Sequence, residues 1–264
     1  MTSAPTAAEA SLELLLELLQ DPRAPVSRAS AESALDVHIA DSLAGLELEE
    51  LERAGRIADL GSGAGLPGLV LAACRPAARF DLIESLGRKC AFLGEAIERM
   101  GLRNASVVCR RSEEWAAGEG REAYDAVTAR AVGTLATVAE LASPLLREGG
   151  VLAAWKGARS PEEEGALARA AERLAMEPLE IRAVRPYSGS RDRHIHLLRK
   201  NGPTPNGLPR RPGMAAKRPF GSEELRPERR WEPSTRSQTR RGASARRPRR
   251  STWAPVSRTT ASRP

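Results

Sequence analysis

A glycine-rich loop is the part of this sequence best suited to hold a small ligand. Residues 59–68 read Asp-Leu-Gly-Ser-Gly-Ala-Gly-Leu-Pro-Gly and follow an apolar run that predicts a strand at Arg56–Leu60. Glycine lets a chain turn sharply after a strand and lets the backbone approach a ligand closely. Pro67 suits the first turn of a following helix, because the N–H that proline lacks has no helical partner there. The spacing predicts a strand–loop–helix element whose loop binds the ligand.

Two classes of ligand fit the spacing of the glycines. The pattern Gly-x-Gly-x-Gly at Gly61, Gly63 and Gly65 suits S-adenosylmethionine. The dinucleotide fingerprint is also matched, with Gly68 as its last glycine. A short-chain dehydrogenase would need Tyr-x-x-x-Lys, and neither tyrosine of the chain has a lysine four residues later. Asp59 stands where the dinucleotide motif usually has an apolar residue, and it can hold the loop backbone or a ligand's ammonium group. These observations favour S-adenosylmethionine.

Acidic and polar residues follow the next two predicted strands. Glu84 ends the strand predicted at Arg79–Glu84, and a carboxylate at that place can accept hydrogen bonds from both hydroxyls of a ribose. Ser112 and Glu113 follow the third predicted strand, in a loop that borders the adenine in this topology. We expect their backbone groups to contact the adenine.

The elements that position these residues alternate between β-like runs and helical stretches. Strands are predicted at Arg56–Leu60, Arg79–Glu84, Ser106–Cys109, Tyr124–Ala129, Val151–Lys156, Leu179–Val184 and His194–Leu198. Helices are predicted at Pro67–Cys74, Leu86–Met100, Thr134–Leu141 and Pro161–Ala175. The alternation predicts an α/β fold with a doubly wound, mostly parallel, seven-stranded sheet that ends in an antiparallel hairpin. We expect this core to span residues 56–199, with a helical cap at residues 1–55.

The positive charge of the chain is concentrated at its C-terminal end. Residues 200–264 hold 17 of the 41 Lys and Arg residues and 4 of the 34 Asp and Glu residues, a net charge of +13. The remaining net charge of −6 falls on residues 1–199. Ten of the 19 prolines also lie in this tail, with few large apolar residues, so we expect residues 200–264 to be disordered. The high isoelectric point therefore supports nucleic-acid binding by the tail and not by the core.

Cysteine and histidine spacing indicates neither a disulfide framework nor a metal centre. Cys74, Cys90 and Cys109 are odd in number and show no Cys-x-x-Cys spacing, which favours structural thiols in the cytosol. His194 and His196 alternate along a predicted strand without a third ligand at suitable spacing. No apolar run approaches the roughly 18 residues of a membrane-spanning helix, so we expect a cytoplasmic protein without metal or membrane segment.

Eight short segments carry a family resemblance. They are His38–Leu43, Asp59–Gly68, Glu84–Lys89, Phe92–Leu93, Arg111–Glu114, Thr128–Ala131, Trp155–Gly157 and Arg193–His194. In their order and spacing they resemble the 16S ribosomal RNA guanine-N7 methyltransferases, also called the glucose-inhibited division protein B family. The resemblance runs from about residue 26 to residue 200.

The resemblance implies a class I S-adenosylmethionine-dependent methyltransferase that acts as a monomer on 16S ribosomal RNA or the small ribosomal subunit. It implies cofactor contacts at Gly61, Leu66, Ser112, Glu113 and Arg130, with Glu84 on the ribose. Guanine N7 has a free lone pair and no proton, so the reaction needs alignment and no base. We therefore expect no catalytic residue, and Arg130 cannot be a base because a guanidinium stays protonated.

Other functions remain open from the residues alone. A methyltransferase of another RNA or of a small molecule would have the same fold, as would a non-catalytic ribosome-binding protein. Aromatic residues make up only 3% of the chain, which speaks against an aromatic-walled pocket for a small molecule. His38 and Asp41, one helical turn apart, can orient RNA or stabilise the contact of the N-terminal helices with the core. Candidates for phosphate contacts are Arg88, Lys89, Arg110, Arg111, Lys156 and Arg159.

Overall fold

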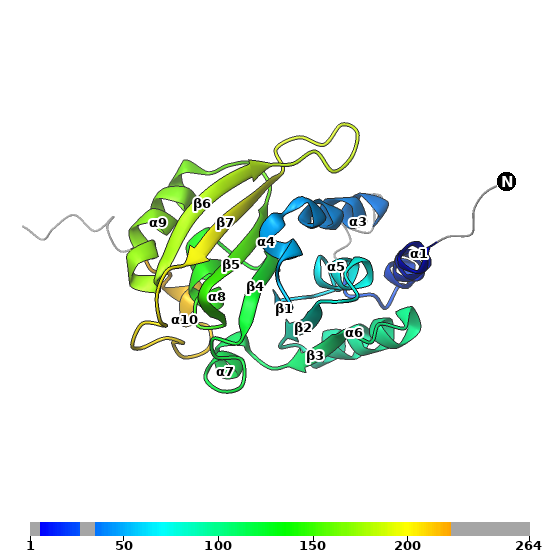
Figure 1. The fold of residues 1–264 in the computed structure, drawn as a ribbon, viewed down its shortest axis with the longest axis horizontal. Coiled ribbons are helices and arrows are strands. Elements are labelled where there is room, and N and C mark those ends of the chain that lie inside the picture. Colours follow the sequence, from blue (N-terminus) through cyan, green and yellow to red (C-terminus); the bar gives the residue numbers. More distant parts are fainter. Residues whose placement is uncertain (1–5, 27–34, 223–264) are drawn as a thin grey trace, which may run out of the picture. The chain divides into compact units, whose positions relative to one another are not determined.

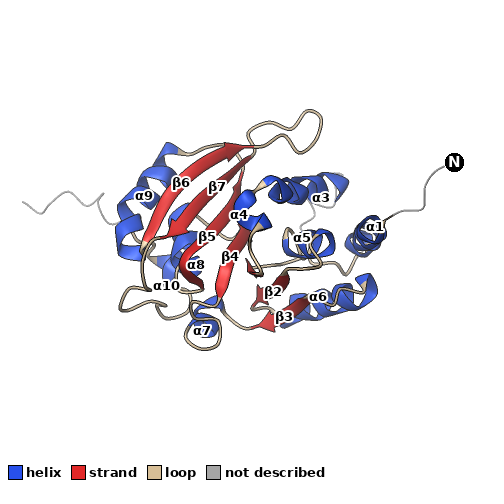
Figure 2. Ribbon diagram, in the orientation of Figure 1, coloured by secondary structure: helices blue, strands red, loops and turns tan. Residues whose placement is uncertain are grey.

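A seven-stranded sheet with helices on both faces organises the chain in the computed structural model (Figures 1 and 2), which describes residues 6–26 and 35–222. The strands are β1 (Arg56–Leu60), β2 (Arg79–Glu84), β3 (Ala105–Cys109), β4 (Tyr124–Arg130), β5 (Leu146–Lys156), β6 (Met176–Ala183) and β7 (His194–Lys200). Their order is β3-β2-β1-β4-β5-β7-β6, and β7 runs antiparallel to both of its neighbours. The predicted doubly wound sheet and its closing hairpin are confirmed.

Helices cover the two faces of the sheet. They are α1 (Ala7–Gln20), α3 (Leu35–Leu43), α4 (Glu49–Glu52), α5 (Gly68–Cys74), α6 (Gly87–Met100), α7 (Ser112–Ala116), α8 (Leu135–Ala142), α9 (Pro161–Ala171) and α10 (Met214–Lys217). Leu69 of α5 and Leu93 of α6 pack with the α1 leucines on one face, while α8 and α9 cover the other. Strands covered on both faces are buried almost throughout, as Ala126–Ala129 of β4 show. No described helix is long and apolar enough to cross a membrane.

Short sequence patterns set the ends of several helices. Thr6 and Glu9 form a capping box at the start of α1, in which each side chain accepts the other residue's backbone N–H. Ser160 caps α9, and proline occupies the first helical position there. Gly101 ends α6 in the left-handed conformation that a residue without Cβ adopts at little cost. The glycine loop differs from expectation by one residue, because α5 begins at Gly68 and Pro67 precedes it.

The C-terminal segment differs from expectation over residues 201–222. We expected disorder from residue 200 onward, but this stretch packs on the core and contains α10, which lies beside α8 (Figure 1). Leu208 and Ala215 are buried, and the partly buried Phe220 packs against the same core. A few apolar groups spaced along a polar, proline-rich stretch are thus enough to attach it. The remainder of the expected tail, residues 223–264, lies outside the described residues.

The cysteines also differ from the expectation of free thiols. Cys90 and Cys109 form a disulfide bond, and Cys74 is free. Sheet register places Cys109 beside Glu84, and the first turn of α6 brings Cys90 above the same strand end. The two residues stand 19 positions apart, so only the folded βαβ arrangement brings their sulfur atoms together.

Gly68 tests how closely α5 packs on the sheet. A Cβ atom at Gly68 would lie 2.5 Å from Leu82 Cδ2 and 2.7 Å from Asp59 Oδ2. We expect Gly68→Ala to lower the free energy of unfolding by about 1–3 kcal/mol, because overpacking forces the neighbours to shift. Gly94→Ala in α6 is the matched control, since its Cβ would meet nothing within 4 Å, and should raise stability by about 0.5–1 kcal/mol. Urea unfolding of both variants measures the difference, and equal effects would contradict the close packing.

Candidate functional site

A cavity of about 280 Å3 opens at the carboxyl ends of β1, β2 and β3. Its wall is formed by Leu60, Gly61, Ile83, Glu84, Ser85, Lys89, Arg110, Arg111, Ser112, Glu113, Ala131, Val132, Thr137, Leu141, Gly213, Ala215 and Ala216. We call it the glycine-loop cavity. The strand order reverses direction between β1 and β4, and doubly wound sheets bind ligands in the crevice at such a switch point.

The glycine loop needs its glycines because three of them adopt positive φ. The φ angles are 66° at Gly61, 59° at Gly63 and 89° at Gly65, a region that L side chains rarely adopt. The backbone N–H groups of Gly61 and Ser62 donate to the carbonyl of Ile83 at the end of β2. A Cβ atom at Gly61 would lie 3.0 Å from Val132 Cγ2, so the loop passes close under Val132. The loop therefore presents bare backbone to the cavity.

Glu84 joins the glycine loop to the start of α6. Its Oε1 accepts the N–H groups of Ser85 at 2.7 Å and Leu86 at 2.9 Å, and its Oε2 accepts the N–H of Gly63 at 3.1 Å. Lys89 Nζ lies 3.7 Å from Oε2. The side chain is buried, yet it lines the cavity. A carboxylate offers about four lone-pair positions, so it retains capacity to accept a ligand hydroxyl.

Ser112 and Glu113 begin α7 on the opposite side of the cavity. Both are 8% exposed and both line the cavity. Ser112 Oγ donates to Glu113 Oε2 at 3.2 Å. The other oxygen of Glu113 accepts the backbone N–H of Gly213 at 2.8 Å, from a segment 100 residues away in the sequence. The carboxylate thus fixes the C-terminal segment at the cavity wall.

Asp59 lies beneath the glycine loop and does not line the cavity. It is 1% exposed, and its Oδ1 accepts the hydroxyl of Thr128 on the neighbouring strand at 2.7 Å. Its Oδ2 has no hydrogen-bond partner and points at the start of α5, where Gly68 leaves room for it. Burial raises the pKa of Asp59 to about 6, although the Thr128 hydroxyl works in the opposite direction. The Asp59 side chain thus lies between β4 and the start of α5, and its role toward the loop or a ligand stays a prediction.

Arg130 faces a second cavity at the ends of β4 and β5. Its Nη1 donates to Asp41 Oδ2 at 3.2 Å and to the carbonyl of His38 at 3.3 Å, which attaches α3 to the sheet edge. Burial lowers the pKa of its guanidinium, while Asp41 opposes that shift. The next residue, Ala131, has a φ of 58°, a costly conformation for alanine that is typical of functional sites. The two bonds from Arg130, to the His38 carbonyl and the Asp41 carboxylate, stabilise the contact of the N-terminal helices with the core.

We call this second space the Arg130 cavity, and it measures about 300 Å3. Its wall is formed by His38, Asp41, Ala129, Arg130, Ala131, Val132, Gly133, Val138, Ala154, Trp155, Lys156, Gly157 and Arg193. Ala131 and Val132 belong to the walls of both cavities, so the two spaces are neighbours across one turn of chain. The Trp155 indole donates to the carbonyl of Asp41 at 2.9 Å and forms the floor beside α3.

The structure brings together most of the residues predicted to contact a cofactor. Gly61, Glu84, Ser112 and Glu113 share the glycine-loop cavity, and Gly63 is bonded to Glu84. Arg130 lies in the adjoining cavity. Leu66 is 8% exposed and packs among the leucines of α1 and α5, away from both walls. The cofactor contacts of these residues stay predictions.

Several basic side chains predicted to contact phosphate already have acidic partners. Arg159 pairs with Glu164 at 2.6 Å, and Lys156 pairs with Glu163 at 2.7 Å. Among the candidates, Lys89, Arg110 and Arg111 line the glycine-loop cavity, and Lys156 lines the Arg130 cavity. No group of three or more potential metal ligands occurs in residues 6–26 and 35–222.

Sequence reasoning did not identify the wall residues supplied by α8 and the C-terminal segment. Thr137 and Leu141 line the cavity from α8, whose sequence reads as an ordinary apolar helix. Ala215 and Ala216 are small residues in a stretch rich in Arg, Pro and Gly, and no pattern singles them out. The one nearby signal is Gly213, which precedes α10 and adopts a positive φ in a tight turn.

The sheet order, the glycine loop and the strand-end carboxylate define a class I S-adenosylmethionine-dependent methyltransferase. A family model described as rRNA small subunit methyltransferase G, GidB, matches residues 12–201. The chain belongs to this family, which confirms the resemblance found in the sequence.

Relatives that match the chain carry the name Ribosomal RNA small subunit methyltransferase G. The protein from Rubrobacter xylanophilus is 43% identical over 194 residues, which cover 72% of this chain and 74% of that protein. The protein from Pelotomaculum thermopropionicum is 42% identical over 186 residues, covering 69% and 77%. The protein from Syntrophomonas wolfei is 41% identical over 195 residues, covering 74% and 90%.

The raised pKa of Asp59 predicts a pH dependence of stability. The unfolded carboxyl ionises near 3.8, whereas the folded one keeps its proton to about 6. Between these values the unfolded state alone ionises, so stability falls as the pH rises from about 4 to about 6. Two pKa units correspond to about 3 kcal/mol. The Asp59→Asn variant should not show this loss of unfolding free energy. Urea unfolding at pH 4 and pH 7 measures it for the variant and the unaltered chain. An identical loss in both would contradict the assignment.

Proposed function

We propose that this chain transfers a methyl group from S-adenosylmethionine to N7 of a guanine in 16S ribosomal RNA. The observation that carries the proposal is the pairing of two adjoining cavities at the sheet's switch point, in a member of the rRNA small subunit methyltransferase G family. One cavity has the features of a nucleoside site, and the other opens beside basic side chains.

The residues of the glycine-loop cavity fit S-adenosylmethionine. Bare backbone at Gly61 and Gly63 admits the ligand closely, because both glycines have positive φ and no Cβ atom. Glu84 accepts the ribose hydroxyls with its remaining lone pairs, and the backbone of Ser112 and Glu113 borders the adenine. When bound, this cofactor supplies an electrophilic methyl group on a sulfonium centre. The chain's own contribution is to orient that group toward Ala131 and the neighbouring cavity.

The Arg130 cavity is the proposed place of the target guanine. It shares Ala131 and Val132 with the wall of the glycine-loop cavity, which places a base and a cofactor close to each other. Guanine N7 carries a lone pair and no proton, so the protein has only to hold the base in line with the methyl group. Arg130 keeps its proton and acts by hydrogen bonding or charge. Trp155, which is buried, lines this cavity on the side of α3.

A basic hairpin beside the Arg130 cavity provides contacts for the RNA backbone. The turn between β6 and β7 carries Arg185, Arg191 and Arg193, and these line a hollow of about 770 Å3. Arg193 also belongs to the wall of the Arg130 cavity, so the hollow lies next to the proposed base site. Arginine binds phosphate through its planar fork of donors. We propose that the RNA strand runs over this turn.

We further propose that the chain acts as a monomer. A ribosomal RNA substrate supports action in the cytoplasm. Calorimetric titration separates the remaining alternatives, because a non-catalytic ribosome-binding protein on this fold would bind S-adenosylhomocysteine weakly or not at all.

Glu84→Gln tests the role of the strand-end carboxylate. The amide that replaces one oxygen places an N–H2 group against backbone N–H donors that now bond to Glu84. We expect at least about tenfold weaker binding of S-adenosylhomocysteine, which is about 1.4 kcal/mol. Glu98→Gln, on the exposed side of α6, is the matched control and should bind as the unaltered chain does. Equal affinity of both variants would remove Glu84 from the site.

Methylation of ribosomal RNA tests the reaction itself. Small ribosomal subunits from a bacterial strain lacking its own enzyme of this family are incubated with the purified chain and labelled S-adenosylmethionine. We expect label in 7-methylguanosine when the 16S RNA is digested to nucleosides and analysed by mass spectrometry. Label in another nucleoside would contradict the N7 assignment, and no label on either subunits or naked RNA would contradict an RNA substrate.

A further inference from the structure

The C-terminal segment, residues 201–222, reaches the glycine-loop cavity although the family model ends at residue 201. Gly213, Ala215 and Ala216 belong to the cavity wall. They face the cavity across from the glycine loop and beside Ser112 and Glu113, where the adenine of the cofactor is expected. A stretch that looks like the start of a disordered tail thus forms part of a ligand site.

Polar contacts hold the first part of the segment. The Lys200 ammonium group is fully buried and donates to the carbonyls of Ser143 at 2.7 Å and Leu146 at 3.1 Å, and to Thr204 Oγ1 at 3.0 Å. The backbone N–H of Thr204 donates to Glu122 Oε1 at 2.6 Å. A buried ammonium group needs such partners, because an unpaired one is costly to desolvate. The segment therefore leaves β7 in a fixed direction.

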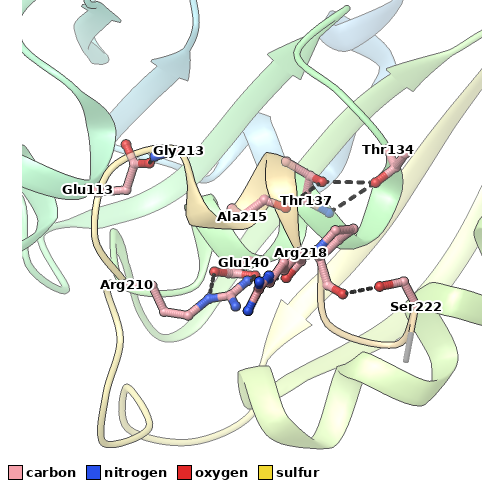
Figure 3. A network of polar contacts seen from close by, with 10 residues as sticks. Glu113, Thr134, Thr137, Glu140, Arg210, Gly213, Ala215, Arg218 and Ser222 are labelled. Carbon is pink, nitrogen blue, oxygen red and sulfur yellow. Dashed lines mark hydrogen bonds and ion pairs between the residues drawn. The ribbon is translucent and has the colours of Figure 1, made fainter. Parts of the chain in front are cut away.

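A buried ion pair holds the middle of the segment. One edge of the Arg210 guanidinium, Nε and Nη2, donates to the two carboxylate oxygens of Glu140 on α8, whose side chain is 2% exposed (Figure 3). Arg210 also donates to the carbonyl of Arg218 at 2.8 Å, which closes the loop around α10. The guanidinium groups of Arg210 and Arg173 lie over the ring of Phe220, at 4.0 Å and 4.2 Å from its centroid. Bidentate pairs of this kind fix geometry as well as contributing energy.

Two hydrogen bonds attach the segment to the cavity itself. Gly213 donates its backbone N–H to Glu113, and Thr137 Oγ1 donates to the carbonyl of Ala215 at 3.1 Å (Figure 3). Ala215 is 2% exposed and packs on α8. Ala216 is exposed and lines the cavity, so its side chain meets open space on the ligand's side. Packing on the core explains Ala215 alone, whereas the position of Ala216 points to a ligand.

We propose that Gly213–Ala216 form the adenosine-side wall of the S-adenosylmethionine cavity, held there by Arg210 as a positioning residue. The inference rests on the proposed function. The wall removes apolar adenine surface from water, and each tenfold of affinity corresponds to about 55 Å2 of such surface at about 25 cal/mol per Å2.

Calorimetric titration with S-adenosylhomocysteine tests the wall in the full chain. Ala216→Phe places a ring at the cavity, and we expect at least about tenfold weaker binding. Lys217→Phe, the next residue on α10, does not line the cavity and is the steric control, with an expected change below about twofold. Both positions are exposed, so the folded state tolerates either ring.

A second pair of variants tests the positioning role of Arg210. Arg210→Gln removes the ion pair with Glu140 and should weaken binding of S-adenosylhomocysteine about three- to tenfold. Arg211→Gln, which alters the same charge at an exposed neighbour, should leave the affinity unchanged. Thermal melting of each variant shows whether a loss of binding follows from unfolding, because a folded Arg210→Gln chain with reduced affinity reports on the wall alone.

Hydrogen exchange of the unaltered chain provides a readout without substitutions. S-adenosylhomocysteine should slow exchange at the amides of residues 213–217 together with those of residues 61–65. Protection at residues 61–65 without protection at residues 213–217 would contradict the proposal that Gly213–Ala216 form this wall. Unchanged affinity in Ala216→Phe would contradict it as well. Tighter binding in Arg210→Gln would show that the C-terminal segment hinders cofactor binding, which also contradicts the proposal. Absence of binding by the unaltered chain would instead overturn the proposed function.

Discussion

One carboxylate couples the two loops on which the site depends. Glu84 accepts backbone N–H groups from the glycine loop and from the segment that leads into α6, so it ties the two together. These donors are partly buried, and a buried N–H group without an acceptor costs about 1–3 kcal/mol. The requirement for an acidic residue at the end of β2 is therefore structural before any ligand binds, and the same oxygens then serve a ribose.

The buried carboxyl group of Asp59, beneath the glycine loop, lowers the stability of the fold when it is ionised. A carboxyl group that is 1% exposed, with one oxygen lacking a partner, is unfavourable in its ionised form. The hydroxyl of Thr128 and the space left by Gly68 allow it to remain. Through Thr128 the group joins β1 to β4 at the point where the strand order reverses. Natural sequences often retain such costs where geometry matters more than stability.

The sequence predicted those parts of the molecule that depend on local patterns. Apolar periodicity located β1 and β2 to the residue, and the positive φ angles of the glycine loop follow from glycine at 61, 63 and 65. Contacts between distant segments were not predictable in this way. The disulfide of Cys90 and Cys109 depends on sheet register, and the bond from Gly213 to Glu113 joins residues 100 positions apart. Alternating patterns carry no information about such pairs.

The placement of Leu66 follows the same rule. The family resemblance implied a cofactor contact at Leu66, and its side chain belongs to the apolar cluster that also holds the leucines of α1. Whether a residue of a loop faces the ligand or the core depends on the helix that packs over the loop. That helix lies about 50 residues earlier in the chain, and its own sequence shows only that one face is apolar. The glycine motif therefore could not predict that Leu66 packs with α1.

The position of α10 has a consequence for the order in which the site is made. A ribosome synthesises the chain from its N-terminus, so the sheet and the glycine loop emerge first and Gly213–Ala216 emerge after every strand is complete. A nascent chain that has released only the residues matched by the family model has an open cavity on one side. The cavity therefore receives its last wall residues only after all seven strands have been synthesised.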